Sequence, residues 1–196
     1  VVIRKASLHS YGELQRLGIQ RHDRVRLHRA GDVIPHITNV IPPKGGAIPS
    51  ADIAKQEPFA FPDRCPSCQS PVVYSSSVGR CSSPPLACPA QNLGLLQHFV
   101  SRSALNITGL GPQHLEFFYE KGWIQQPVDI FSLLDKKEEL EQFPHWGEKS
   151  VHRLFDSIEK SRDMDFSTFI HSLGILGIGE HMAQKIAQTY QTPENW

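Results

Sequence analysis

Two periods of hydrophobicity divide this chain into a β-rich start and a helical second half. Residues 24–29 (RVRLHR) alternate with a period of two, so that Val25 and Leu27 face one way and the polar side chains face the other. Such alternation is typical of a half-exposed β-strand. After a turn signal (AGD), the β-branched run at residues 33–41 predicts a second strand, which Pro35 places at a sheet edge or a bulge.

The helical half covers residues 92–196, where apolar positions recur with a period near 3.6. Three glycine turns each open a predicted helix, namely ITGLG at Ile107–Gly111, FPHWG at Phe143–Gly147 and LGIG at Leu176–Gly179. Apolar residues then fall at i, i+3, i+4 and i+7, as in Val151, Leu154, Phe155 and Ile158, or in Ala183, Ile186, Ala187 and Tyr190. Each helix therefore has one apolar face, and the repeated units are expected to pack on one another.

Neither period extends through the middle of the chain. Residues 42–63 hold five prolines and a Gly-Gly pair, which predicts a linker or a long ordered loop. Residues 64–91 hold all four cysteines. We therefore expect four parts, at residues 1–41, 42–63, 64–91 and 92–196. In the first part, a short helix is expected between Ser10 and Leu17.

The four cysteines, Cys65, Cys68, Cys81 and Cys88, follow the spacing C-x2-C, twelve residues, C-x6-C. Two close pairs around a short β-like stretch are typical of a four-cysteine zinc site, and so short a segment needs the free energy of metal binding to fold. Because cysteine would fill every position around the ion, the zinc would be structural rather than catalytic. Two disulfides of a secreted protein and a redox-active dithiol are the alternatives. His98, the nearest histidine, is interpreted as an ordinary helix-surface residue rather than a ligand.

The glycine turns carry the second candidate chemistry. Glycines before a helix let a bound group approach the backbone, and the free N–H groups at the helix start suit an anion such as a DNA phosphate. Phosphate contacts carry no sequence information. The candidate DNA-binding glycines are Gly109, Gly111, Gly147, Gly177 and Gly179. The alternative is that each turn only connects two helices. Trp146 in the second turn is interpreted as a packing residue.

The net charge of zero hides an asymmetry between the two ends of the chain. Residues 1–44 carry eight Lys/Arg against three acids, a net charge of +5, whereas residues 106–196 carry eight against fourteen, a net charge of −6. The basic start suggests a polyanion partner, with Arg24, Arg26 and Arg29 as candidate phosphate contacts. No apolar run approaches the roughly 20 residues that span a bilayer, and no signal peptide is apparent.

Several short motifs, in their order along the chain, resemble one family. They are KASLH at residues 5–9, RAGDVIP at 29–35, CPAQ at 88–91, GEKS at 147–150, and the GLG and LGILGIGE of two glycine turns. Each motif is weak alone, but their order is specific. Over nearly its whole length the chain resembles the middle and C-terminal part of bacterial NAD-dependent DNA ligases.

The resemblance implies a multidomain α+β architecture: part of an oligonucleotide-binding (OB) β-barrel, a small four-cysteine zinc module and an all-α helix-hairpin-helix domain. It also implies an enzyme that attaches AMP from NAD to a lysine, passes it to the 5′-phosphate at a nick and seals the nick with Mg²⁺, in DNA replication and repair. The expected partner is nicked double-stranded DNA, bound without regard to sequence. The expected protein is monomeric and cytoplasmic, with no membrane association.

Other features favour a fragment of such an enzyme. The chain has no initiator Met, begins inside a predicted strand, and has no KxDG motif around any of its lysines. We therefore expect the adenylated lysine to lie elsewhere, the helix-hairpin-helix domain to be truncated, and this chain alone to be inactive. The alternatives are a non-catalytic, zinc-containing DNA-binding accessory protein of repair and a disulfide-linked secreted protein.

Overall fold

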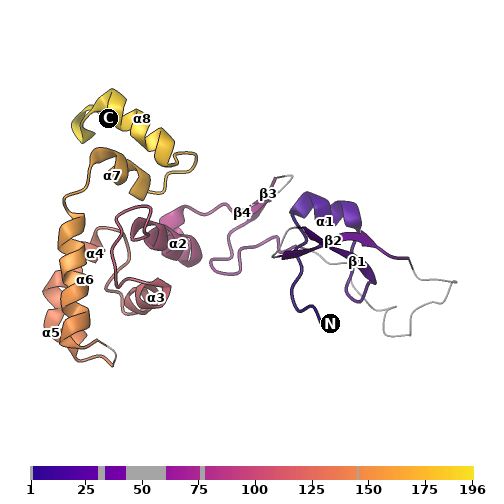
Figure 1. Ribbon diagram of the computed structural model, residues 1–196, viewed down its shortest axis with the longest axis horizontal. Helices are drawn as coiled ribbons and strands as arrows, with labels where there is room; N and C mark the ends of the chain where they lie inside the picture. The colour runs from indigo at the N-terminus through magenta and orange to yellow at the C-terminus, as the bar shows by residue number, and fades with distance from the viewer. Residues whose placement is uncertain (1, 31–33, 43–60, 76–77, 145) are drawn as a thin grey trace. The chain divides into compact units, whose positions relative to one another are not determined.

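The computed structural model describes residues 2–30, 34–42, 61–75, 78–144 and 146–196, apart from the side chains of Arg29 and Ala30. The chain forms two compact units, Val1–Ser83 and Pro84–Trp196 (Figure 1). The finer division into four parts stays a prediction, because most of the expected linker and part of the AGD turn lie outside the described residues. No helix in the described ranges is both long and apolar enough to cross a membrane.

The first unit begins with the short helix α1 (Tyr11–Leu17), which the sequence predicted. The Ser10 side chain caps it by accepting a hydrogen bond from the Glu13 N–H, and Gly18 ends it in the left-handed conformation. Strands β1 (Val25–Ala30) and β2 (Ile34–Val40) then pair antiparallel. On its other side, β2 forms an isolated parallel β-bridge, in which His36 pairs with Ser7.

Both strands predicted at the start of the chain are present. Of the two alternatives for Pro35, a sheet edge or a bulge, the edge is observed, because β2 belongs to a two-stranded sheet and the register slips elsewhere, between Arg26 and Leu27. Pro35 pairs with Arg29, and its carbonyl accepts a hydrogen bond from the Ser7 N–H at 2.7 Å. Leu27 is 38% exposed, as a half-exposed strand allows, because this two-stranded sheet offers little apolar surface to cover it.

The cysteine segment of the first unit forms a small hairpin of β3 (Val72–Tyr74) and β4 (Gly79–Cys81). Its aromatic side chain, Tyr74, stacks on Tyr11 of α1 with ring centroids 4.7 Å apart. Phe61 contacts both rings edge-on, and the Tyr74 hydroxyl donates to the Pro62 carbonyl at 2.6 Å. The hairpin and α1 are therefore held together by an aromatic cluster.

The second unit is helical. Its elements are η2 (Pro85–Ala87), α2 (Pro89–Phe99), α3 (Pro112–Glu120), α4 (Asp129–Ser132), η3 (Leu133–Lys136), α5 (Lys137–Glu141), α6 (Glu148–Ser161), α7 (Phe166–Ser172), α8 (Glu180–Tyr190) and η4 (Pro193–Asn195). The helices predicted to follow the three glycine turns are α3, α6 and α8, and all three begin directly after the last glycine of the turn.

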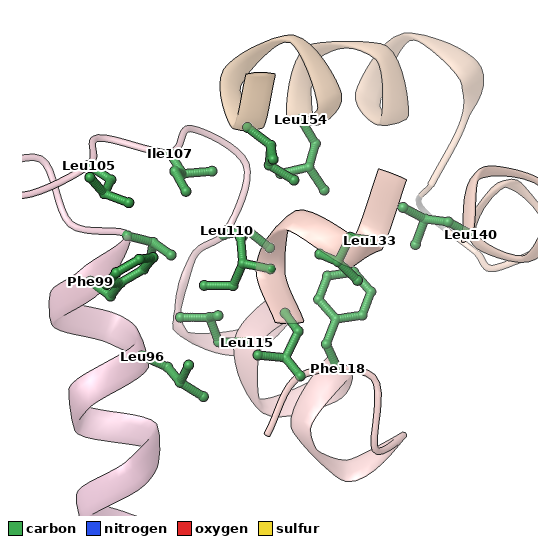
Figure 2. Close-up of a cluster of buried hydrophobic side chains, with 14 of the residues drawn as sticks. Leu96, Phe99, Leu105, Ile107, Leu110, Leu115, Phe118, Leu133, Leu140 and Leu154 are labelled. Carbon is green, nitrogen blue, oxygen red and sulfur yellow. The ribbon is translucent and has the colours of Figure 1, made fainter. Parts of the chain in front are cut away.

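A single apolar core joins α2 to α6 (Figure 2). Its buried members are Leu96, Phe99, Val100, Leu105, Ile107, Leu110, Leu115, Phe118, Ile124, Ile130, Leu133, Leu140, Trp146, Val151, Leu154 and Ile158. Figure 2 shows Leu110 of the first glycine turn and Leu154 of α6 pointing into the same cluster. The first two glycine turns therefore share one core, as the apolar helix faces predicted.

The third glycine turn belongs to a separate hairpin of α7 and α8. Ile170 and Ala183 are fully buried in these two helices but are not part of the main core. The hairpin meets α2 through His98, whose Nε2 donates to the His171 carbonyl at 2.8 Å and whose ring packs edge-on against the His171 ring. The interpretation of His98 as an ordinary surface residue is therefore wrong, since it joins two helices.

Candidate metal centre and nucleic-acid interface

The four cysteines converge on one point. One sulfur from each of Cys65, Cys68, Cys81 and Cys88 lies within 4.8 Å of every other, and the Cys68 and Cys81 sulfurs are 3.4 Å apart. Cys65 and Cys88 are buried, whereas Cys68 and Cys81 are half-buried. All four are thiols and none is joined in a disulfide. The disulfide alternative therefore has no support in the structure.

Local backbone structure explains this convergence. The segment after Cys65 turns back on itself, because the Gln69 N–H donates to the Cys65 carbonyl and the Cys65 N–H donates to the Ser70 carbonyl, both at 2.8 Å. Gln69 takes a left-handed conformation with φ of 61° to close this turn. Cys81 ends strand β4, and Cys88 is the N-cap residue of α2.

The thiols repel one another as anions, which favours a cation between them. The backbone hydrogen bond at Ser83 lowers the pKa of Cys81, but desolvation and the nearby Cys68 and Cys65 thiols together raise it, to about 11. Four thiolates therefore require a bound cation to coexist here at neutral pH. Around a tetrahedral Zn²⁺ with bonds of about 2.3 Å, sulfurs lie roughly 3.8 Å apart, a spacing close to that of this cluster.

The glycines that directly precede the three helices share one geometry. Gly111, Gly147 and Gly179 have φ of −70°, −78° and −84°, all extended, and each is the N-cap of its helix without a side-chain hydrogen bond. A Cβ added at any of the three would meet nothing within 4 Å. The N–H groups at these helix starts therefore have no side-chain cap, and the space beside each glycine is open to a ligand.

The preceding glycines of the first and third turns have a different task. Gly109 and Gly177 have positive φ of 97° and 85°, which favours glycine. A Cβ at Gly109 would lie 3.5 Å from the Cβ of Leu154, so this glycine faces α6 inside the protein. Its carbonyl accepts a hydrogen bond of 2.6 Å from His114 Nδ1. These two positions shape the turns, and only Gly177 has open space beside it.

The second turn is anchored by an aromatic side chain instead of a second glycine. Trp146 is 6% exposed, and its ring packs 4.6 Å from that of His114 on α3. The interpretation of Trp146 as a packing residue is confirmed. His145, which precedes it, lies outside the described residues. This contact between tilted rings joins the second turn to the helix that follows the first turn.

The candidate arginines lie on or beside β1. Arg24 and Arg26 are exposed, and Arg29 belongs to β1 while its side chain is not among the described atoms.

A contact between the first glycine turn and α6 was not predicted from the sequence, because it joins residues 49 positions apart. The Ser157 hydroxyl on α6 accepts hydrogen bonds from the Thr108 N–H at 2.8 Å and from the Thr108 hydroxyl at 3.1 Å. The first turn is therefore tied to α6.

Comparison with known proteins assigns the family. Residues 1–47 match the model of the NAD-dependent DNA ligase OB-fold domain. The chain is 40% identical to a DNA ligase of Neorickettsia sennetsu and 43% identical to one of Gluconobacter oxydans, in both cases over its whole length. It is 41% identical over 97% of its length to a DNA ligase of Psychrobacter cryohalolentis. The chain spans 27–28% of the length of these relatives. It belongs to the NAD-dependent DNA ligase family.

Proposed function

We propose that this chain binds the sugar–phosphate backbone of nicked double-stranded DNA, without regard to sequence, as part of an NAD-dependent DNA ligase. The three helix starts at Gly111, Gly147 and Gly179 carry the proposal, because each has an extended glycine, no side-chain cap and open space beside it. Such N–H groups attract an anion, and a phosphate is the anion that a ligase substrate presents. In this proposal α3, α6 and α8 are the second helices of helix-hairpin-helix units.

The acidic charge of this half of the chain is compatible with such binding. Backbone N–H groups act at hydrogen-bond distance, so that local geometry replaces net charge. Two carboxylates near these N–H groups would repel a phosphate. They belong to Glu148 and Glu180, which occupy the first positions of α6 and α8 and are exposed. We propose that the exposed Arg24 and Arg26, with Arg29, add phosphate contacts from an OB-fold segment at residues 1–41.

We further propose that Cys65, Cys68, Cys81 and Cys88 hold one structural Zn²⁺. Their donor set fits, since all four sulfurs lie within 4.8 Å of one another and zinc prefers four thiolates. Bound zinc would supply folding free energy rather than catalysis, because no coordination position remains for substrate. Within this chain the bound ion would stabilise the turn after Cys65 and the β3–β4 hairpin that ends at Cys81.

The reaction of the whole enzyme lies beyond the residues described. We propose that the parent protein transfers AMP from NAD through a lysine to the 5′-phosphate of a nick, and that Mg²⁺ assists the sealing step. Outside the cysteine cluster, the described residues contain no group of three or more metal-ligating side chains. In this proposal the chain grips and orients the duplex for replication and repair, as a monomer in the cytoplasm.

Binding of the purified chain to a nicked duplex over a salt series, with and without a zinc chelator, tests the function. We expect affinity to fall linearly with salt on a log–log scale, since each phosphate contact contributes about 0.9 to the slope. We also expect one zinc per chain, and a smaller slope after chelation because the first unit loses its fold. Equal binding to scrambled duplexes is the control for sequence independence.

One outcome would contradict the DNA-binding proposal and another the zinc proposal. A folded chain that does not bind duplex at any salt concentration would mean that the glycine turns only connect helices. A zinc content near zero with unchanged melting in chelator would remove the metal site but leave the backbone interface standing.

A further inference from the structure

A polar groove of about 520 Å³ lies beside the first glycine turn, on the flank of α6. We call it the Thr108 groove. It is lined by Leu105, Asn106, Thr108, Arg153, Asp156, Ser157, Lys160 and Ser161. The α6 members Arg153, Ser157 and Lys160 are spaced i, i+4 and i+7, so they lie on one face of the helix. The groove therefore brings two cations to the side of a turn already proposed to meet DNA.

The groove is held open in a fixed shape by hydrogen bonds. Ser157 accepts from both the N–H and the hydroxyl of Thr108, which fixes the turn against the middle of the helix face. Asn106 takes a left-handed conformation with φ of 50°, and its N–H donates to the Ser101 carbonyl at 2.8 Å. The backbone of the first glycine turn, which forms one side of the groove, is thus anchored in place.

The two cationic side chains of the groove, Arg153 and Lys160, are available to bind an anion. Neither Arg153 nor Lys160 forms an ion pair with another residue of the described part, and both are exposed. Three other cations of the same unit are already held in ion pairs. Lys136 and Lys137 pair with Glu139 and Glu141, and Arg162 pairs with Glu159 and covers the Phe131 ring.

The single carboxylate of the groove does not neutralise both cations. Asp156 lies 3.4 Å from Nε2 of His152, on the same helix, rather than against Arg153 or Lys160. With two cations and one carboxylate, the lining keeps a positive excess next to three hydroxyl groups, those of Thr108, Ser157 and Ser161. That combination suits a phosphate, which accepts hydrogen bonds and carries negative charge.

We propose that the Thr108 groove is a second type of phosphodiester site, in which Arg153 and Lys160 bind backbone phosphates of the duplex beside the first glycine turn. The inference rests on the proposed DNA-binding function and deepens it, because it assigns phosphate contacts to side chains of α6 in addition to the backbone of the turns. Arg153 and Lys160 stand about 10.5 Å apart along the helix axis. Since phosphates of one strand advance about 3.4 Å along the duplex axis, the two cations reach different phosphates.

Charge removal tests the groove in the full chain. The variant Arg153→Gln/Lys160→Gln should lower the slope of log affinity against log salt by about 1.8, because two phosphate contacts are lost. The matched control is Lys136→Gln/Lys137→Gln, which removes the same charge from ion-paired positions on η3 and α5 and should leave the slope unchanged. Both variants alter exposed side chains, and equal melting temperatures would verify that they are folded.

Each outcome separates the groove from the function on which it rests. If the wild-type chain binds duplex and the Arg153→Gln/Lys160→Gln variant keeps the wild-type salt slope, the groove does not bind phosphate, and the proposed function stands. If both double variants lose slope equally, general charge and not the groove is responsible. If the wild-type chain shows no salt-dependent binding, the proposed function fails and the groove fails with it. Should the double variant unfold, each single variant should lose about 0.9 of slope instead.

Discussion

At the scale of single residues, the two glycines of a turn differ in what they tolerate. Gly177 has a positive φ, so a side chain there strains the backbone even though space is open. Gly179 has an extended backbone that any residue adopts, and its neighbourhood is empty. A side chain at Gly179 therefore fits the protein but occupies the place of a ligand. Effects on stability and on DNA binding should therefore separate at these two glycines, which are two positions apart in the sequence.

The variant Gly179→Asp should bind duplex DNA more weakly without losing stability. Aspartate is a good N-cap, and its charge suits a helix start, so the free energy of unfolding should stay equal or rise by a few tenths of a kcal/mol. The same carboxylate would satisfy the N–H groups and repel phosphate, which lowers affinity by roughly 10- to 100-fold.

Melting curves and duplex titrations of Gly179→Asp and Gly177→Ala check this separation. Gly177→Ala should cost about 1–3 kcal/mol of stability, because alanine resists a positive φ. The uncharged cap Gly179→Asn separates capping from charge repulsion. Undiminished affinity in Gly179→Asp would show that the third turn does not meet phosphate.

At the scale of elements, the hairpin of α7 and α8 depends on a side-chain N-cap at the start of α7. The Asp165 carboxylate accepts hydrogen bonds from the Ser167 hydroxyl at 2.6 Å, the Thr168 N–H at 2.8 Å and the Thr168 hydroxyl at 2.9 Å. The Ser167 bond, followed by the Thr168 bonds, lowers the pKa of Asp165 below its ordinary value of 3.8. The charged form therefore stabilises the hairpin.

Removing this cap should destabilise the second unit. Asp165→Ala should cost about 0.5–2 kcal/mol, the usual range for a lost N-cap. Because the folded pKa is depressed, the stabilisation by Asp165 is complete above pH 3.8 and is lost as the pH falls further. Asp165→Asn keeps an acceptor but does not titrate, so it should lose less stability than wild type on acidification. Parallel acid melting curves of wild type and Asp165→Asn would contradict the assignment.

What could be predicted from the sequence was mostly local. Glycines and the i, i+3, i+4, i+7 pattern predicted α6 and α8, because helix starts and apolar faces depend on residues a few positions apart. The spacing of the cysteines likewise indicated their convergence. The bond between Thr108 and Ser157, the packing of His98 on His171 and the stacking of Tyr11 on Tyr74 were not predicted. Each joins residues 49 to 73 positions apart, and no periodicity reports such contacts.

At the scale of the whole chain, the two units have different sources of stability. The buried apolar core lies in the second unit. Among the described residues of the first unit, Leu14 and Cys65 are the buried apolar side chains. So little burial among these described residues is a small offset to the entropy of folding, and the proposed zinc would therefore be a main stabilising contribution of that unit.

Thermal unfolding should therefore show two transitions, of which a chelator affects one. Removal of the proposed zinc should abolish or lower the transition of the first unit, which supplies three of the four cysteines. The transition of the second unit, which supplies Cys88, should move by no more than a few degrees. Calorimetry with and without chelator measures both transitions. The variant Cys81→Ser, in the absence of chelator, should show the same change as the wild-type chain with chelator. A single transition that ignores the chelator would mean that the first unit folds independently of metal.

The hydrogen bonds between Thr108 and Ser157 have a consequence for avidity. Helix α6 begins at the second glycine turn and is fastened to the first turn ten residues later, about 15 Å along its axis. In the proposed function, the two turns would thus be two phosphate-binding sites joined by one rigid helix. Once either site binds a phosphate, the length of the helix would set the effective concentration of the other site. Weak single contacts would then add up only on a DNA backbone whose phosphate spacing matches the distance between the two sites.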